Sequence, residues 1–218
     1  MKSLIKNSLV LMGVAVLSIL NTQAQAYDPL AYDYGGNYQD FGGYINLNWE
    51  ITTPLGSTAD FVGKTSTRGF GFDARFAASD HIALGFYTGW NYLFEKAERQ
   101  VYSKSGIDVS AVQSKYLYLT PLMFQAHYYA NLSPNIKPYI GMGIGGYKVT
   151  YEKWWGTRIE SARWWDFAWS PQAGVQIVSS DGGVGLNLGV KYTGVNFSHG
   201  DLDGITTLVY SVGLALGL

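Results

Sequence analysis

A histidine near the C-terminus has neighbours that could support nucleophilic hydrolysis. His199 follows Ser198, and Asp201 and Asp203 come shortly after it in the segment NFSHGDLDG. A serine hydroxyl, an imidazole and a carboxylate are the groups of a hydrolytic triad. The same composition is typical of an ordinary turn, and the two aspartates are too few for a calcium loop. We therefore expect no catalytic residue and no metal ligand here, with activity through His199 as a minor alternative.

A glycine-rich motif lies at residues 141–146 (GMGIGG) and matches the G-x-G-x-x-G pattern of dinucleotide-binding sites. In such sites the motif follows a strand and begins a helix. Here residues 147–151 continue a strand pattern, so we predict neither a cofactor-binding site nor a cofactor. The glycines are expected to keep the interior clear, with a bulge at Gly145 and Gly146. That bulge would turn Lys148 away from the apolar face.

Residues 81–95 show most clearly what kind of secondary structure the chain is built from. Their side chains alternate between a large apolar face and a face of small and polar residues, with Leu93 as the exception. The apolar face consists of Ile82, Leu84, Phe86, Thr88, Trp90, Tyr92 and Phe94. Period-two alternation predicts a β-strand, and only the small, polar face fits inside a narrow barrel. The apolar face is therefore expected to meet lipid.

Eight such segments follow one another along the chain. They cover residues 44–53, 67–78, 81–95, 115–130, 137–151, 163–178, 184–195 and 205–218. Their connections alternate between long (54–66, 96–114, 152–162, 196–204) and short (79–80, 131–136, 179–183). Alternating loop lengths and an even strand number are typical of outer-membrane barrels. The predicted fold is all-β: an eight-stranded antiparallel up-and-down transmembrane β-barrel over residues 44–218. A soluble lipocalin-like barrel is the alternative, but it would expose apolar stripes that soluble proteins avoid.

The N-terminus reads as an export signal. A positively charged start, an apolar run over residues 8–20 and a small-residue cleavage site ending at Ala26 predict a signal peptide over residues 1–26. Residues 27–43 show no regular period and are expected to form a periplasmic tail. The chain contains no Cys, which excludes disulfides. Charged residues make up only 14%, and the net charge of −1 gives no electrostatic case for nucleic-acid binding.

Polar residues of both charge signs fall on the face predicted to line the lumen. They are Glu50, Asp73, Arg75, Gln125, His127, Asp166, Gln172, Gln176, Asn187 and Lys191. A Lys or Arg facing mid-bilayer lipid costs about 2–4 kcal/mol, which drives such residues inward. An eight-stranded lumen is narrow enough for side chains to fill. We expect a paired, structural network that plugs the barrel; a proton or solute path is the alternative.

The segment 152–165 (EKWWGTRIESARWW) is the most distinctive surface feature. Lys153, Trp154, Trp155, Arg158 and Arg163 could contact lipopolysaccharide, with the basic groups on phosphates and the tryptophans on sugar or acyl chains. The alternative is that the two flanking strands extend past the membrane and the tryptophans belong to an interfacial aromatic girdle.

Three segments carry a resemblance to a known family. PYIGMGIGGYKV (138–149), PLMFQAHYY (121–129) and GLNLGVKYTG (185–194) resemble the small eight-stranded outer-membrane β-barrel superfamily, which includes the OmpA transmembrane domain, OmpX and OmpW. The resemblance implies the outer membrane of a Gram-negative bacterium, periplasmic termini and insertion by the barrel-assembly machinery. The chain ends at Leu218, not at the aromatic residue common in that family, so a variant assembly signal is expected.

Three functions are compatible with these features. The first is a non-enzymatic outer-membrane protein with a filled lumen, serving envelope integrity or surface interaction through its long extracellular loops. Its partners would be outer-membrane lipid and lipopolysaccharide, and it would be a monomer. The second is a narrow, porin-like channel of the OmpW type. The third is a lipid A-modifying enzyme, although the His-x-Ser-Asn pattern of the deacylases is absent around His199.

Overall fold

The computed structural model describes most of the chain from residue 42 onward. The residues outside the description are 1–41, 98–99, 105–106, 131–132, 134, 156–157, 180–182 and 201. The predicted signal peptide over 1–26 therefore lies outside the described residues, as does nearly all of the predicted tail. Among the described residues, no helix is long and apolar enough to cross a membrane.

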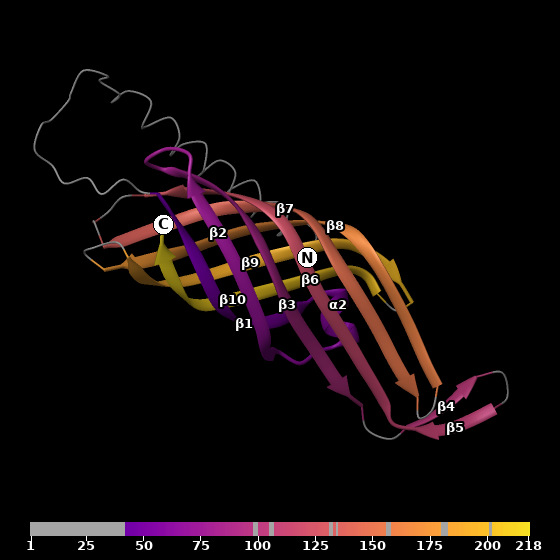
Figure 1. The fold of residues 1–218 in the computed structure, drawn as a ribbon. Helices are drawn as coiled ribbons and strands as arrows, with labels where there is room; N and C mark the ends of the chain where they lie inside the picture. The colour runs from indigo at the N-terminus through magenta and orange to yellow at the C-terminus, as the bar shows by residue number, and fades with distance from the viewer. Residues whose placement is uncertain are drawn as a thin grey trace, which may run out of the picture. The chain divides into compact units, whose positions relative to one another are not determined.

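Eight antiparallel strands of the described chain close into one barrel (Figure 1). They are β1 (Gly43–Leu55), β2 (Ser66–Ala77), β3 (Ile82–Lys96), β6 (Gln113–Tyr129), β7 (Ile136–Trp155), β8 (Arg158–Val178), β9 (Val184–His199) and β10 (Leu202–Gly217). Each barrel strand pairs with the next along the chain, and β1 closes the ring by pairing with β10. The predicted eight-stranded antiparallel barrel is confirmed.

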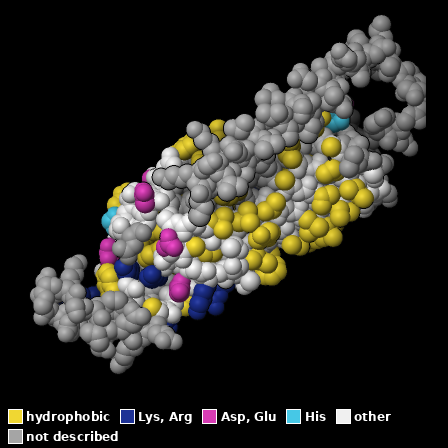
Figure 2. All heavy atoms as spheres, turned by 180° about the vertical axis from the view of Figure 1, so that it is seen from behind, with side chains coloured by type: hydrophobic (Ala, Val, Ile, Leu, Met, Phe, Trp, Pro, Cys, Tyr) yellow, Lys and Arg dark blue, Asp and Glu magenta, His cyan; other side chains and the backbone are white. Residues whose placement is uncertain are grey.

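The alternating sequence forms these strands because the two barrel faces meet different surroundings. On β3, Leu84 and Phe86 are 52% and 46% exposed, whereas Ala83 and Tyr87, which flank them on the opposite face, are buried. Figure 2 shows hydrophobic side chains over the middle of the barrel surface, with Lys and Arg gathered toward one end. A lipid-facing outer surface explains why large apolar side chains are left uncovered by protein.

The connections predicted to be long contain more regular structure than the sequence indicated. The first holds a short helix, α2 (Ser57–Phe61), and the second holds a hairpin of β4 (Gln100–Lys104) and β5 (Ile107–Ala111). Most of the predicted loop 152–162 belongs to β7 and β8, and most of 196–204 belongs to β9 and β10. Pairing between β7 and β8 extends to Trp155 and Arg158, whereas pairing between β8 and β9 begins only at Ala168.

The bulge predicted at Gly145 and Gly146 is absent. Both glycines stay in continuous register with β6 and with β8. A Cβ added at Gly145 would lie 2.8 Å from the Cα of Met123, so glycine permits a close approach of two strands without an extra residue. The alternation therefore continues unbroken, and Lys148 lies on the outer, lipid-facing side of β7.

Candidate functional site

The middle of the lumen is organised around the carboxylate of Glu50, a fully buried residue of β1. The Lys191 ammonium donates to Oε1 at 2.7 Å. The Tyr87 hydroxyl lies 2.8 Å from Oε2, and the Asn91 amide donates to Oε2 at 2.9 Å. Lys191 Nζ is also 3.3 Å from the Tyr87 ring centroid. The buried charge of Glu50 is therefore compensated by one cation and two neutral donors, which a buried carboxylate requires.

Two glycines of β2 make room for this carboxylate. A Cβ added at Gly71 would lie 2.5 Å from Glu50 Oε1 and 3.0 Å from the Tyr87 ring. A Cβ at Gly69 would lie 2.9 Å from Glu50 Cβ and would also collide with the side chain of Asn91. The small residues on the inner face of β2 are thus explained by the size of the polar cluster beside them.

A second charged cluster is centred on Arg75 of β2, which is 1% exposed. Its guanidinium donates to Asp73 Oδ2 from Nε at 2.8 Å and from Nη2 at 2.5 Å. Nη1 donates to the Tyr129 hydroxyl at 2.9 Å, and the guanidinium carbon lies 4.3 Å from the Tyr139 ring centroid. Both nitrogens contact the same carboxylate oxygen, and Oδ1 of Asp73 has no hydrogen-bond partner among the described residues. Hydrogen bonds between two charged groups are stronger than those between neutral groups.

Amide side chains connect this cluster to the opposite wall. The Tyr129 hydroxyl donates to Gln176 of β8 at 3.1 Å. The Tyr139 hydroxyl donates to Asn187 of β9 at 3.0 Å, and Asn187 donates in turn to Asn48 of β1 at 2.9 Å. Hydrogen bonds therefore cross the lumen between strands that are not neighbours in the sheet.

The remaining residues predicted to line the lumen also point inward. Gln125 and His127 of β6 and Gln172 of β8 are buried, and the His127 ring meets Tyr139 edge-on with centroids 5.4 Å apart. The side-chain nitrogen and oxygen of Gln125 have no hydrogen-bond partner among the described residues, and neither does Oδ2 of the half-buried Asp166. The predicted residues thus separate into two connected charged clusters and a less connected set.

Replacing Asp73 by alanine is expected to destabilise the barrel. Arg75 would lose its counter-charge but keep its contacts with Tyr129 and Tyr139, so the cost should be about 2 kcal/mol. For a chain of this size that corresponds to a fall of roughly 4–8 °C in the unfolding temperature. Heat-shifted gel mobility measures it, with the exposed Asp60→Ala as the control. Equal unfolding temperatures for the two variants would contradict the role assigned to Asp73.

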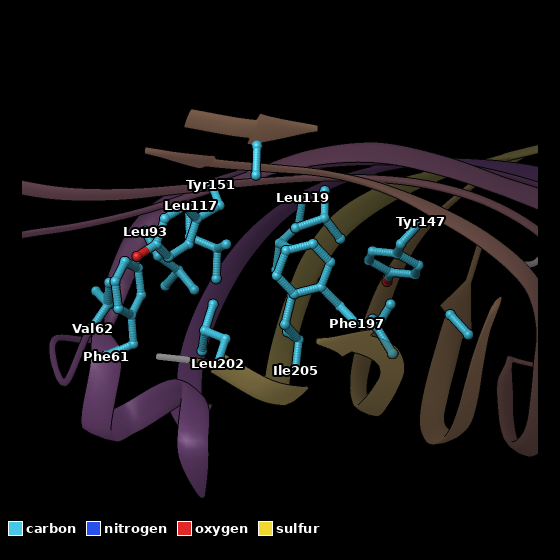
Figure 3. Packing of buried hydrophobic residues seen from close by; sticks show 14 of the residues in the cluster. Phe61, Val62, Leu93, Leu117, Leu119, Tyr147, Tyr151, Phe197, Leu202 and Ile205 are labelled. Atoms are coloured by element: carbon cyan, nitrogen blue, oxygen red, sulfur yellow. The ribbon is translucent and has the colours of Figure 1, made fainter. Parts of the chain in front are cut away.

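A second block in the lumen is apolar, and the sequence pattern did not predict it. Its members are Phe61, Val62, Tyr87, Leu93, Leu117, Leu119, Met123, Tyr147, Val149, Tyr151, Ala162, Ala168, Val195, Phe197, Leu202 and Ile205. Figure 3 shows Phe61 and Val62, at the end of α2, beside Leu93, Leu117 and Tyr151. One feature of the sequence indicated the apolar block: Leu93 is an apolar residue on the otherwise small and polar face of β3, near the end of that strand.

Helix α2 is fixed over this apolar block by specific contacts. The Thr206 N–H donates to Thr58 Oγ1 at 2.8 Å, and Ser57 Oγ donates to the Gly204 carbonyl at 2.8 Å. The Phe61 ring stacks on Tyr151 with centroids 4.8 Å apart. Residues at both ends of the helix are therefore bound to the barrel, and the helix acts as a cap on the apolar end of the lumen.

The residues of the possible hydrolytic triad do not come together. Ser198 and His199 are consecutive residues of β9 and therefore point to opposite faces of the strand. The His199 ring instead lies against Trp164, with centroids 4.8 Å apart. Asp201 lies outside the described residues. Among the described residues, no group of three or more His, Cys, Asp or Glu side chains could hold a metal ion.

The five residues proposed to contact lipopolysaccharide lie on two opposite faces of the β7–β8 hairpin. The register pairs Glu152 with Ser161 and Lys153 with Glu160. Trp154 and Arg163 therefore share the outer face, whereas Lys153, Trp155 and Arg158 continue the face that lines the lumen further down. Lys153 Nζ lies 4.9 Å from the Trp155 ring centroid. The hairpin is not alone at this level, because β6 pairs with β7 as far as Gln113 and Trp155, and β3 pairs with β6 as far as Lys96 and Ser114.

Comparison with known proteins agrees with this architecture. A family model described as "Outer membrane protein beta-barrel domain" matches residues 12–216. The structure of Neisserial surface protein A is similar, with a TM-score of 0.52, 14% identity, and coverage of 81% of this chain and 97% of that chain. Ail of Yersinia pestis has a TM-score of 0.46 at 12% identity, covering 81% and 96%. OprG of Pseudomonas aeruginosa has a TM-score of 0.44 at 13% identity, covering 81% and 96%.

No curated protein matches the chain significantly. At 14% identity, the likeness to Neisserial surface protein A supports the fold alone. The family match is the stronger finding because it spans nearly the whole of the described barrel. The chain therefore belongs to the outer membrane protein β-barrel family and is an outer-membrane protein of the Gram-negative type.

Proposed function

We propose that this protein is a non-enzymatic outer-membrane barrel with a filled lumen, acting in envelope integrity or in surface interaction. The observation that supports the proposal is the filling of the barrel interior by two groups of buried side chains, one polar and one apolar. The network around Glu50 and Arg75 crosses the polar part, and the apolar block under α2 occupies the rest. A conducting pore would need a continuous path through both. The separation of Ser198 from His199 argues against a lipid A-modifying enzyme.

The proposed orientation places both termini in the periplasm after export by the signal peptide over residues 1–26. The first residues of β1 pair with the last residues of β10, so both barrel ends lie at one rim. The connections 78–81, 130–135 and 179–183, which join β2 to β3, β6 to β7 and β8 to β9, lie at that rim as well. Short periplasmic turns are usual in this class. Helix α2, the β4–β5 hairpin and the β7–β8 hairpin would then face the cell exterior.

The proposed partners follow from this placement. Outer-membrane lipid and lipopolysaccharide would surround the apolar surface, and the barrel-assembly machinery would insert the chain. The closed ring of strands supports a monomer, because pairing of β1 with β10 completes the barrel within one chain. The low net charge supports no interaction with nucleic acid.

Planar-bilayer conductance tests the closed lumen. Protein whose folding is verified by a heat-shifted gel band is expected to give no current above that of the bare bilayer. The measurement needs no ligand, because salt ions are small enough to report any continuous water path. Steady single-channel steps from the folded protein would refute the filled lumen and establish the narrow, OmpW-type channel in its place.

A further inference from the structure

The outer surface changes from apolar to polar at the same level on β7 and β8. On the outer face of β7, Ile144 is 54% exposed, and Gly146, Lys148 and Thr150 follow it toward the β7–β8 hairpin end. On the outer face of β8, Trp165 is 58% exposed, and Arg163 is the next residue toward the same end. Tryptophan is enriched where acyl chains give way to headgroups. Lys148 and Arg163 therefore lie at the border where a bilayer presents its phosphate groups.

The strand register brings these two cations together. Lys148 is directly opposite Trp165, and Arg163 is directly opposite Thr150. Lys148 and Arg163 are consequently diagonal neighbours on one face, a relation that typically separates residues by about 7–8 Å. Both side chains are long enough to reach a common anion between them. An arginine fork and a lysine ammonium are the groups that most often bind phosphate oxygens.

Neither cation is neutralised by the protein. Among the described residues, no ion pair includes Lys148 or Arg163. Glu152 is the acidic residue on this part of the outer face, and its Oε2 accepts a hydrogen bond from the Trp154 indole at 3.1 Å. Two cations and one carboxylate leave the face with a net positive charge. A cation beside the hydrocarbon layer is costly unless it reaches water or an anion.

An open groove lies beside Arg163 on this face. Its volume is about 240 Å³, and it is lined by Thr150, Glu152, Ser161, Ala162 and Arg163. Lys148 is not part of the lining, but it lies next to Thr150 on the same face of β7. Below it, the Trp165 ring covers Gly146, where an added Cβ would lie 3.3 Å from the ring. The groove thus has hydroxyl donors along its sides and an indole between it and the apolar band.

We propose that Lys148 and Arg163 form a binding site for the phosphate of a lipid headgroup, with Thr150 and Ser161 as supporting hydroxyl donors. The proposal rests on the orientation given above, which makes the surrounding layer the outer leaflet. The phosphate could come from lipid A or from an anionic phospholipid, since both present the same charged oxygens. This site shares Arg163 with the five-residue contact expected from the sequence, and both of its cations lie on one face.

Lipid binding to the folded, full-length protein in detergent tests the site. Native mass spectrometry gives apparent dissociation constants for phosphorylated lipid A, dephosphorylated lipid A and phosphatidylglycerol. The Lys148→Gln/Arg163→Gln variant should bind phosphorylated lipid A on the order of 30-fold more weakly than the wild type, from about 1 kcal/mol per cation. Dephosphorylated lipid A should bind the wild type as weakly as phosphorylated lipid A binds the variant.

The same hairpin offers a matched control. Lys153→Gln/Arg158→Gln removes the same charge from the opposite face and should leave the affinity for phosphorylated lipid A unchanged. Glu152→Gln should strengthen binding, because it removes the carboxylate from the groove. Unchanged affinity in the Lys148→Gln/Arg163→Gln variant, or equal weakening in the control, would overturn the proposal.

The phospholipid arm identifies the source of the phosphate. Weaker phosphatidylglycerol binding in the Lys148→Gln/Arg163→Gln variant would assign the site to lipid phosphates in general. Phosphatidylglycerol binding that does not change, with lipid A binding lost, would assign it to lipid A. The result is independent of the closed lumen: a conducting wild type that binds lipid through this pair would refute the proposed function and leave the site standing.

Discussion

Replacing Glu50 by glutamine is expected to lower the free energy of unfolding by about 3–5 kcal/mol, because it strands the buried Lys191 ammonium without a counter-charge. Glutamine keeps the size of the side chain and an oxygen that can accept from Tyr87 and Asn91. The change therefore removes the charge and one of the two acceptor oxygens, so that an amide NH2 faces the donor of Lys191 or Asn91. Urea unfolding of the folded protein in detergent, followed by tryptophan fluorescence, measures the loss.

A double-mutant cycle separates the ion pair from its surroundings. The Glu50→Gln/Lys191→Met variant removes both charges and should recover most of the stability, since a buried pair replaced by neutral residues is often close to neutral in free energy. Asp203→Asn, at an exposed position of β10, controls for the loss of one negative charge. Ordinary surface substitutions change the free energy of unfolding by up to about 0.5 kcal/mol. A change no larger than this in the Glu50→Gln variant would mean that the ion pair does not stabilise the barrel.

The second large effect is expected in conductance, when both blocks of the lumen are removed together. Phe61→Ser/Val62→Ser should release the cap from the apolar block but leave the network around Glu50 in place. Glu50→Ala/Asp73→Ala/Arg75→Ala/Lys191→Ala should remove both charged clusters but leave the cap. Because the two blocks lie in series, each variant alone should stay silent in a planar bilayer. The combined variant should give resolvable current steps.

Each variant must first show the heat-shifted band of a folded barrel. Current through the cap variant alone would mean that the polar network does not close the lumen. Silence of the combined variant would place a third obstruction among the remaining inward side chains, where Tyr129 and Tyr139 still contact each other.

The sequence by itself determined the barrel. Alternation in segments such as β3 fixes which face each side chain takes, because a one-residue shift in register would move every apolar side chain from lipid into the lumen. The number of alternating segments indicates eight strands, and the alternating loop lengths indicate the up-and-down topology. The inward position of Glu50, Arg75 and Lys191 followed from the same alternation.

The sequence left the partners of those inward residues undetermined. Glu50 lies 141 positions from Lys191, and their contact depends on the closure of β1 against β10 and on the tilt of the strands. The apolar block was missed for a related reason. Phe61 lies in a connection without period-two alternation, so only the fold shows that α2 turns back over the lumen.

Lys148 shows the same division between local pattern and tertiary structure. Strict alternation places it on the lipid-facing side, and the bulge predicted at the Gly145–Gly146 pair would turn it away from that side. In the proposed phosphate site a lysine on that side is not costly, because Trp165 is paired with it and tryptophan is enriched at the interface, where an ammonium reaches phosphate and water. Periodicity determines the face of a residue, but its depth in the membrane and its neighbours on other strands depend on how all eight strands are aligned.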